Sequence, residues 1–310
     1  MTHQPPTAIM CRSLLFVPGN RSDMLDKAAG LRPDVFVPDM EDSVPAGEKH
    51  AARMTVAAYL GSLAATGRLV VPRVNAVGSE FIDDDLRAVV SPQTFGVSVG
   101  KVGSAADLVS LDEMLARLEP AAGVPEGSTG VFAWLETASG VVNAPEICRA
   151  TSRLVGVAFG GEDFTNDMEI SRYEDGPEGV DGAAHESPAL SYARSAIVTA
   201  ARAGGVLALD TPFFGFRDPE GLAADCRRAR GFGFTGKFAI HPSQIDTINR
   251  AFSPSDDEVN QARREIAAFE AAERQGRGST SLDDQVIDVP VVERARKLIK
   301  KHEAAAAMEN

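Results

Sequence analysis

The chain has 310 residues, of which 44% are hydrophobic and 24% charged, a composition typical of a packed globular protein and too apolar for a disordered one. Its 44 acidic side chains outnumber its 31 basic ones and give a formal net charge of −13. This balance argues against nucleic acid as the main partner, because phosphate binding requires clustered Lys and Arg. No apolar run approaches the roughly 20 residues that span a bilayer, and residues 1–11 lack a signal pattern, so we expect a soluble cytoplasmic protein.

Eight short apolar runs, rich in Val, Leu and Phe, recur along the chain, and most of them are separated by stretches with helical periodicity. Their apolar character is continuous rather than alternating. This indicates strands that are buried on both faces, as in a parallel sheet covered by helices. The runs are Ser13–Pro18, Val35–Glu41, Leu69–Asn75, Val97–Val102, Val131–Thr137, Leu154–Asp163, Val206–Pro212 and Lys237–Pro242.

Helix start signals between and after these runs support the same architecture. Ser104 is placed to cap a helix over Ala105–Leu118, and Ser255-x-x-Glu258 is a capping box ahead of a helix from Asp256 to about Arg274. Eight βα units in about 240 residues predict a (β/α)8 barrel, the TIM-barrel fold, with a C-terminal helical extension. An open doubly wound sheet is the alternative, but no Gly-rich dinucleotide fingerprint follows any predicted strand.

The length of the chain is compatible with two domains, but a single barrel reaches the same size. We assign residues 1–253 to a catalytic barrel and residues 254–310 to C-terminal helices with a linker and a lid segment. Gln275–Ser281, rich in Gly and polar residues, is the predicted flexible linker, and a final helix is expected over Pro290–Lys301. Arg172–Pro188 is too long for an ordinary βα loop, and such loops tend to be lids or binding loops.

Candidate reactive groups stand where a barrel enzyme carries them, at the carboxyl ends of the predicted strands. Arg73 lies at the end of the third strand, Glu136 at the end of the fifth and Asp163 at the end of the sixth. Neighbouring parallel strands lie roughly 4.8 Å apart, so the two acids can reach a common point. Two such carboxylates repel each other unless a proton or a cation bridges them, and a small set of hard oxygen ligands suits Mg²⁺. The alternative is that these acids are helix caps and rim charges.

Six motifs occur in the order of one family and cover the chain from Arg12 to about Lys301. Through them the chain resembles the citrate lyase β-subunit-like proteins of the HpcH/HpaI aldolase superfamily, which includes malyl-CoA and citramalyl-CoA lyases. Gly100-Lys101 stands where this family more usually has Pro-Lys. The motifs are Arg12-Ser13-Leu14-Leu15-Phe16-Val17-Pro18-Gly19, Asp39-x-Glu41-Asp42-x-Val44 with Lys49 and Arg53 behind it, Arg73-Val74-Asn75, Glu136-Thr137-Ala138-x-Gly140-Val141, Gly160-Gly161-Glu162-Asp163 and Gly236-Lys237-x-x-Ile240-His241-Pro242-x-Gln244.

The resemblance implies a carbon–carbon lyase that uses Mg²⁺, or Mn²⁺, to cleave a malyl-, methylmalyl- or citramalyl-type CoA thioester to an acyl-CoA and a 2-oxo acid. By similarity, Glu136 and Asp163 hold the metal, which chelates the oxo acid, and Arg73 contacts the oxygen on which charge develops. Glu41 and Asp42 are implied to orient metal-bound water. Their alternative role is a charge pair at the amino end of a helix.

The resemblance also implies a lid and a CoA site. Val286-Ile287-Asp288-Val289-Pro290 matches the C-terminal sequence with which family members that act on free CoA esters supply an acid/base Asp, often to a neighbouring subunit. Asp288 is therefore the predicted proton-transfer group, and its alternative role is the N-cap of the following helix. Arg21, Lys27 and Lys49 are the predicted contacts of the CoA phosphates, unless each is a solvated helix charge. The resemblance further suggests a homotrimer or hexamer with exchanged lids.

Three other functions are compatible with the same residues. A malyl-CoA thioesterase would use the site to direct water at the thioester carbonyl. The carrier-linked β subunit of citrate lyase is less favoured, because a carrier protein would compete with the Asp288 lid for space. A non-catalytic CoA-binding protein is disfavoured because both acids, the arginine and the lid aspartate are present together.

Overall fold

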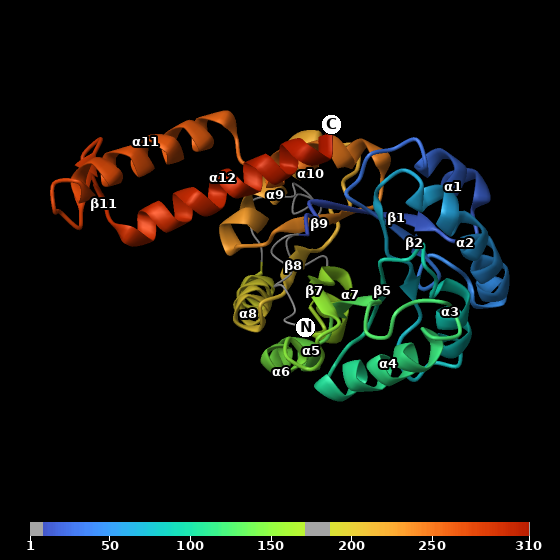
Figure 1. The fold of residues 1–310 in the computed structure, drawn as a ribbon. Coiled ribbons are helices and arrows are strands. Elements are labelled where there is room, and N and C mark those ends of the chain that lie inside the picture. The colour runs from blue at the N-terminus through green and yellow to red at the C-terminus, as the bar shows by residue number, and fades with distance from the viewer. Residues whose placement is uncertain (1–8, 171–186, 310) are drawn as a thin grey trace. The chain divides into compact units, whose positions relative to one another are not determined.

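The computed structural model describes residues 9–170 and 187–309 (Figure 1). Contacts divide the chain into two compact units, Met1–Ile248 and Asn249–Asn310. The predicted assignment of a catalytic barrel to residues 1–253 and of a lid-bearing extension to residues 254–310 stays a prediction. Most of the long loop expected at Arg172–Pro188 lies outside the described residues. Among the helices that the structure describes, none combines the length and the apolar character needed to cross a bilayer.

The described residues of the first unit form nine parallel strands that close into a barrel. The strands are β1 (Ser13–Pro18), β2 (Val35–Asp39), β3 (Leu69–Val70), β4 (Arg73–Val74), β5 (Gly96–Val99), β6 (Gly130–Leu135), β7 (Leu154–Phe159), β8 (Leu207–Asp210) and β9 (Gly236–Ala239). The sheet closes because β1 pairs with both β2 and β9. β3 and β4 each pair with β2 and together replace one predicted strand, interrupted at Pro72, which has no backbone N–H to donate. The predicted (β/α)8 barrel is confirmed, and the open sheet is excluded.

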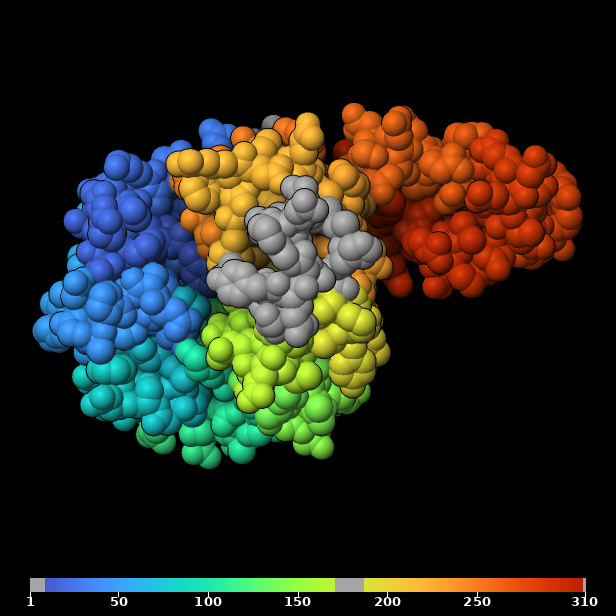
Figure 2. Space-filling view, turned by 180° about the vertical axis from the view of Figure 1, so that it is seen from behind, coloured from blue at the N-terminus to red at the C-terminus, as the bar shows by residue number. Residues whose placement is uncertain are grey.

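Helices surround this barrel on its outside (Figure 1). They are α1 (Ser22–Ala28), α2 (Lys49–Ala64), α3 (Ile82–Val89), α4 (Ala105–Leu118), α5 (Ala138–Val142), α6 (Ala144–Ile147), α7 (Gly161–Asp167), α8 (Pro188–Gly204), α9 (Pro219–Phe232) and α10 (Ile245–Phe252), with 3₁₀ turns η2 (Ala46–Glu48) and η3 (Pro242–Gln244). The predicted cap Ser104 opens α4, where it forms a capping box with Asp107. Figure 2 shows successive segments of this unit following one another around the barrel, from blue through green to yellow.

Aromatic side chains fill much of the barrel interior. The ring of Phe238 has its centroid 5.1 Å from that of Phe16 and 4.3 Å from that of Trp134. Phe132 and Leu14 belong to the same buried cluster. Because these side chains fill the interior, it is a packed core rather than a pore. Burying each large apolar side chain stabilises the fold by about 1.5–3 kcal/mol. Functional groups are therefore carried at the strand ends.

The second unit pairs two long helices with a small hairpin. Its elements are α11 (Asp256–Glu273), β10 (Thr280–Leu282), β11 (Gln285–Ile287) and α12 (Val289–Glu309). The predicted capping box of Ser255 and Glu258 opens α11. The predicted linker Gln275–Ser281 is too long at its carboxyl end, because β10 begins at Thr280. The sequence did not indicate this strand, since its backbone pairing with β11 needs no apolar side chain.

The hairpin is fixed to the helices on one face and exposed on the other. Asp283 and Asp284 form its turn with φ values of 50° and 60°, the left-handed conformation that a tight two-residue hairpin turn requires. Ile287 is buried against Phe269 and Val292 of the two helices. The hairpin therefore presents the residues that flank Ile287 on a fixed support.

Candidate active site

A cavity of about 320 Å³ opens at the carboxyl ends of the barrel strands, within the range of small-ligand sites. Of the residues predicted for the site, Asp42, Arg73, Glu136 and Asp163 line it. The other lining residues are Phe16, Pro18, Asp39, Ser43, Trp134, Gly160, Gly161, Glu162, Thr211, Pro212, Phe214 and Ile240. The barrel thus brings both predicted metal-binding acids and the predicted arginine to one cavity.

Arg73 is held in place by Asp39, a motif residue for which no role was predicted from the sequence. Its Nε donates to Asp39 Oδ1 at 2.7 Å and its Nη2 donates to Asp39 Oδ2 at 2.6 Å, a bidentate pair across neighbouring strands. Asp39 also accepts the backbone N–H groups of Glu41 and Ser43. Burial disfavours the charge of Asp39, but the Arg73 guanidinium outweighs it and keeps the pKa of this carboxyl below its usual value. The guanidinium is therefore a fixed positive charge.

The edge of Arg73 that does not bind Asp39 faces two more acids. Its Nη1 lies 3.2 Å from Glu41 Oε2 and 3.3 Å from Asp42 Oδ2. Burial, followed by the charge of Asp42, raises the pKa of Glu41, although the neighbouring charges of Arg73 and Lys101 oppose this shift. The alternative role for these acids was a charge pair at the amino end of a helix. Neither lies in the first turn of a helix, because both lie in the turn after β2.

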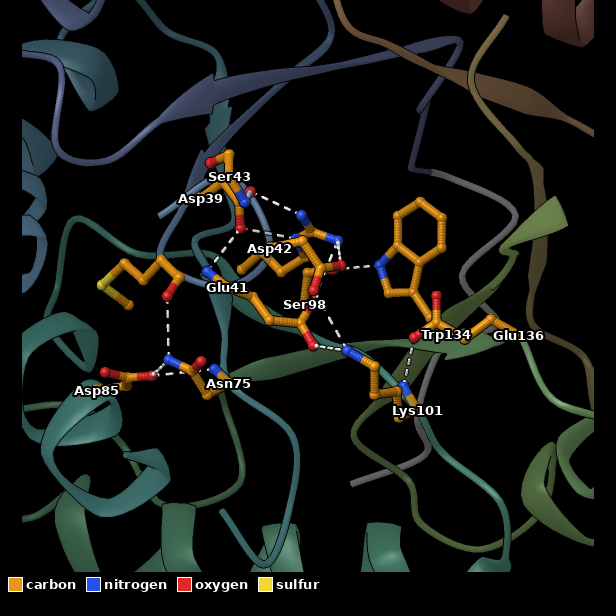
Figure 3. A network of polar contacts seen from close by, with 12 residues as sticks. Asp39, Glu41, Asp42, Ser43, Asn75, Asp85, Ser98, Lys101, Trp134 and Glu136 are labelled. Atoms are coloured by element: carbon orange, nitrogen blue, oxygen red, sulfur yellow. Dashed lines mark hydrogen bonds and ion pairs between the residues drawn. The ribbon is translucent and has the colours of Figure 1, made fainter. Parts of the chain in front are cut away.

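Lys101, to which the sequence analysis assigned no role, connects these acids with Glu136. Its Nζ lies 3.0 Å from Glu41 Oε1 and 3.3 Å from Asp42 Oδ1, while its backbone N–H donates to Glu136 Oε1 at 2.6 Å (Figure 3). Its φ of 58° is left-handed, a conformation that non-glycine residues keep only when their surroundings impose it. The signal in the sequence was its position directly after a strand, beside Gly100.

Glu136 is 2% exposed and its charge is poorly compensated. Burial and then the nearby carboxylates of Glu41 and Asp163 raise its pKa to about 8. Asp163 lies in the first turn of α7, exposed at the wall of the same cavity. A cation bound beside Glu136 would therefore relieve the repulsion between these carboxylates.

Two glycines leave room for the Glu136 side chain. A Cβ on Gly100 would lie 2.8 Å from Glu41 Oε1 and 2.9 Å from Glu136 Oε1. A Cβ on Gly160 would lie 2.4 Å from Glu136 Cβ and 2.5 Å from its Oε2. All four distances are shorter than non-bonded atoms tolerate, so these positions require glycine as long as Glu41 and Glu136 keep their places.

The predicted CoA-binding cations occupy different environments. Arg21 pairs with Asp23 on the exposed surface of α1, with 2.9 Å between Nε and Oδ1. The Lys27 side chain is 78% exposed. Lys49, by contrast, is buried at the start of α2, and its Nζ donates to the backbone carbonyls of Met40 and Glu41. Only the first two cations carry their charged ends on the surface.

Asp288 belongs to the second unit and caps α12. Its Oδ1 accepts the N–H of Val291 at 3.4 Å and its carbonyl accepts the N–H of Val292. The N-cap geometry considered from the sequence is present, and it leaves the carboxylate partly exposed. Val286 and Val289 beside it are 69% and 52% exposed.

Residues 12–242 match the model of the family described as HpcH/HpaI aldolase/citrate lyase. The chain belongs to this family. It is 37% identical to the citrate lyase subunit beta of Leuconostoc mesenteroides subsp. cremoris, over 93% of this chain and 92% of that one. It is 36% identical to a (3S)-malyl-CoA thioesterase of Cereibacter sphaeroides strain KD131, over 99% of both chains. The resemblance inferred from the six sequence motifs is thereby confirmed.

A solved structure shares the fold over almost the whole chain. The protein CitE of Mycobacterium tuberculosis, crystallised in complex with magnesium, acetoacetate and coenzyme A, superposes with a TM-score of 0.72. The two sequences are 33% identical, and the match covers 96% of this chain and 99% of CitE. The family thus includes a protein that holds a metal ion, a small oxo acid and CoA together.

Proposed function

We propose that this protein is a Mg²⁺-dependent lyase that cleaves a 3-hydroxyacyl-CoA thioester of the malyl, methylmalyl or citramalyl type to an acyl-CoA and a 2-oxo acid. The observation that carries the proposal is the shared cavity of Glu136, Asp163 and Arg73. Two acids that need a cation and one fixed guanidinium stand around a space of small-molecule size. The magnesium and CoA bound by CitE, and the magnesium and pyruvate bound in another of its structures, support the same assignment.

The residues of the cavity fit a divalent cation. In the described part of the chain, no Lys or Arg side chain forms an ion pair with Glu136, and Glu41 Oε2 is buried without accepting a hydrogen bond. No described group of three or more His, Cys, Asp or Glu residues is arranged around a metal position. Two carboxylates with open positions suit Mg²⁺, which keeps water and takes substrate oxygens as its remaining ligands.

The chemistry we propose needs positive charge at two places. Glu136 and Asp163 would hold Mg²⁺, which would supply positive charge to the oxygens of the oxo acid. Arg73 donates from its Nη1 edge, which does not bind Asp39, to the oxygen on which charge develops while the carbon–carbon bond breaks. Glu41 and Asp42 keep that edge oriented and orient water in the cavity. Mn²⁺ is the other metal that we expect to support the reaction.

Cleavage needs a base that takes the proton of the 3-hydroxyl group, and breaking the carbon–carbon bond leaves an enolate on the thioester and the carbonyl group of the 2-oxo acid. We propose that the Asp288 carboxylate takes this proton and returns it to the α-carbon of the enolate, so that no net proton is gained or lost. The hairpin supports the role, since buried Ile287 anchors it while the neighbouring valines and the partly exposed carboxylate remain free to meet a ligand. Arg21 and Lys27 are the proposed contacts of the CoA phosphates, because their charged ends are exposed.

Asp288→Asn is expected to lower kcat about 100-fold, because general acid–base groups typically contribute 10²–10⁴-fold. The Mg²⁺ affinity should not change. Mixing Asp288→Asn with a Glu136→Gln variant in the proposed homotrimer or hexamer should restore part of the activity if the aspartate serves a neighbouring subunit. Full activity of Asp288→Asn alone would contradict the assignment.

Gly160→Ala is expected to weaken Mg²⁺ binding at least about tenfold, because the new Cβ displaces Glu136. Gly61→Ala, inside α2 and with no atom near its added Cβ, is the matched control. It should leave Mg²⁺ binding unchanged and stabilise the protein by about 0.5–1 kcal/mol. Isothermal calorimetry measures the Mg²⁺ affinity of the wild type, Gly160→Ala and Gly61→Ala, and equal values for all three would show that Glu136 does not hold the ion.

A thioesterase is the second candidate, favoured by the 36% identity with (3S)-malyl-CoA thioesterase over 99% of both chains. The deciding assay supplies purified protein and Mg²⁺ with malyl-, methylmalyl- and citramalyl-CoA, and identifies the products. A 2-oxo acid with an acyl-CoA supports the lyase, whereas free hydroxy acid and CoA identify the thioesterase. Turnover only on a carrier-bound thioester would indicate a citrate lyase β subunit, and no product from any thioester would indicate a non-catalytic CoA-binding protein.

A further inference from the structure

The ammonium group of Lys49 is buried and donates hydrogen bonds inside the protein. Lys49 is 7% exposed, and its Nζ donates to the carbonyl oxygens of Glu41 at 2.6 Å and Met40 at 2.9 Å. Burial lowers the pKa of this group, so the charge is kept at some cost in free energy. Burying a charged amine costs free energy unless hydrogen bonds compensate it. Here the compensating bonds go to carbonyl groups in the turn that follows β2.

That turn is held on both of its polar sides. Its N–H groups at Glu41 and Ser43 donate to the Asp39 carboxylate. Its carbonyl groups at Met40 and Glu41 receive Lys49, and the Met40 carbonyl also accepts Asn75 Nδ2 at 3.0 Å. Asp39 and Lys49 thus fix the same peptide segment from opposite sides.

Two of the side chains of this turn lie beside Arg73. Glu41 Oε2 and Asp42 Oδ2 lie 3.2 Å and 3.3 Å from Arg73 Nη1, and Asp42 lines the cavity. We propose that Lys49 is a positioning residue that sets Glu41 and Asp42 against Arg73, rather than a contact of the CoA phosphates. The inference rests on the proposed function, since it assigns Arg73 to the developing charge.

The test compares Lys49→Met, which removes both donors, with Lys49→Gln, which keeps an N–H donor one atom closer to the backbone. Lys49→Met should lower kcat about 100-fold, the typical effect of misplacing a reacting group by about 1 Å. Its affinity for free CoA, measured by calorimetry, should stay within about twofold of the wild type. Lys49→Gln should recover part of the lost kcat, because the carbonyls regain a donor.

Lys27→Met is the comparison for a true phosphate contact. Lys300→Met is the control that should match the wild type, because Lys300 is an exposed residue of α12. Lys27→Met should weaken CoA binding and raise KM with little change in kcat. The inference is overturned if Lys49→Met weakens CoA binding as Lys27→Met does, or if its kcat is unchanged. Equal losses for Lys49→Gln and Lys49→Met would also contradict it.

Hydrogen exchange separates this inference from the proposed function. In Lys49→Met, amide exchange should accelerate in residues 39–44 and stay unchanged in the other barrel strands, whether or not the protein turns over a thioester. Unchanged exchange in this segment, or acceleration throughout the barrel, overturns the positioning role. A wild-type protein that neither binds CoA nor cleaves a thioester contradicts the proposed function instead.

Discussion

Arg73→Lys is expected to lower kcat by about 10²–10³-fold, the usual effect of losing one donor aimed at developing charge. Lysine keeps the positive charge, but it cannot bind Asp39 through two parallel N–H bonds and still direct a third donor toward the cavity. The charge would therefore be displaced from the oxygen that it must stabilise. Initial rates of 2-oxo acid release from malyl-CoA measure the effect.

The matched control for this substitution is Arg264→Lys, because Arg264 is an exposed arginine that pairs with Asp283 in the second unit. Exposed ion pairs contribute about 0–1 kcal/mol, so this variant should keep its rate. The melting temperature of Arg73→Lys separates misplacement from unfolding. A correctly folded Arg73→Lys protein with a rate within tenfold of the wild type would contradict the role of the bidentate pair.

Glu136→Gln is expected to abolish Mg²⁺ binding and, at the same time, to stabilise the metal-free protein at alkaline pH. The folded-state pKa of Glu136, raised to about 8 by burial, Glu41 and Asp163, lies above the ordinary glutamate value of 4.5. The folded state then binds the proton more tightly than the unfolded state, so stability is lost as pH rises from about 4.5 to 8 and the loss is complete above 8. Each pKa unit corresponds to about 1.4 kcal/mol.

Denaturant unfolding between pH 5 and pH 9 checks this prediction, with EDTA or with excess Mg²⁺ present. The wild type should lose stability with rising pH in EDTA and regain about 2.7 kcal/mol at a Mg²⁺ concentration 100 times its Kd. Glu136→Gln should show neither change, whereas the exposed-loop control Glu126→Gln should behave like the wild type. Equal stabilisation of Glu136→Gln by Mg²⁺ would remove this residue from the metal site.

The barrel could be predicted because its sequence signals are local. Continuous apolar runs indicate strands covered on both faces, and Ser104 and Ser255 indicate where the two helices that they cap begin. The candidate site followed from the same logic, since strand ends converge in a barrel and therefore bring Glu136 and Asp163 to one cavity.

The contacts that hold the site depend on register and rotamer, which single positions in a sequence do not specify. Asp39 pairs with Arg73 only because β2 and β4 align these two residues. Lys101 joins Glu41 to Glu136 through a left-handed backbone that nothing in its side chain predicts. Lys49 was predicted to contact the CoA phosphates, with a solvated helix charge as the alternative, and instead it donates to the carbonyl groups of Met40 and Glu41 in the turn after β2.

The most direct test of the account is the formation of the carbon–carbon bond itself. Acetyl-CoA and glyoxylate are incubated with the wild-type protein, and the CoA esters are analysed by mass spectrometry. The account predicts a new 3-hydroxyacyl-CoA with the summed mass of the two substrates, formed with Mg²⁺ and absent with EDTA or with Glu136→Gln. Propionyl-CoA with glyoxylate and acetyl-CoA with pyruvate extend the test to the methylmalyl and citramalyl types. If none of the three pairs condenses while the protein binds Mg²⁺, the site does not perform lyase chemistry.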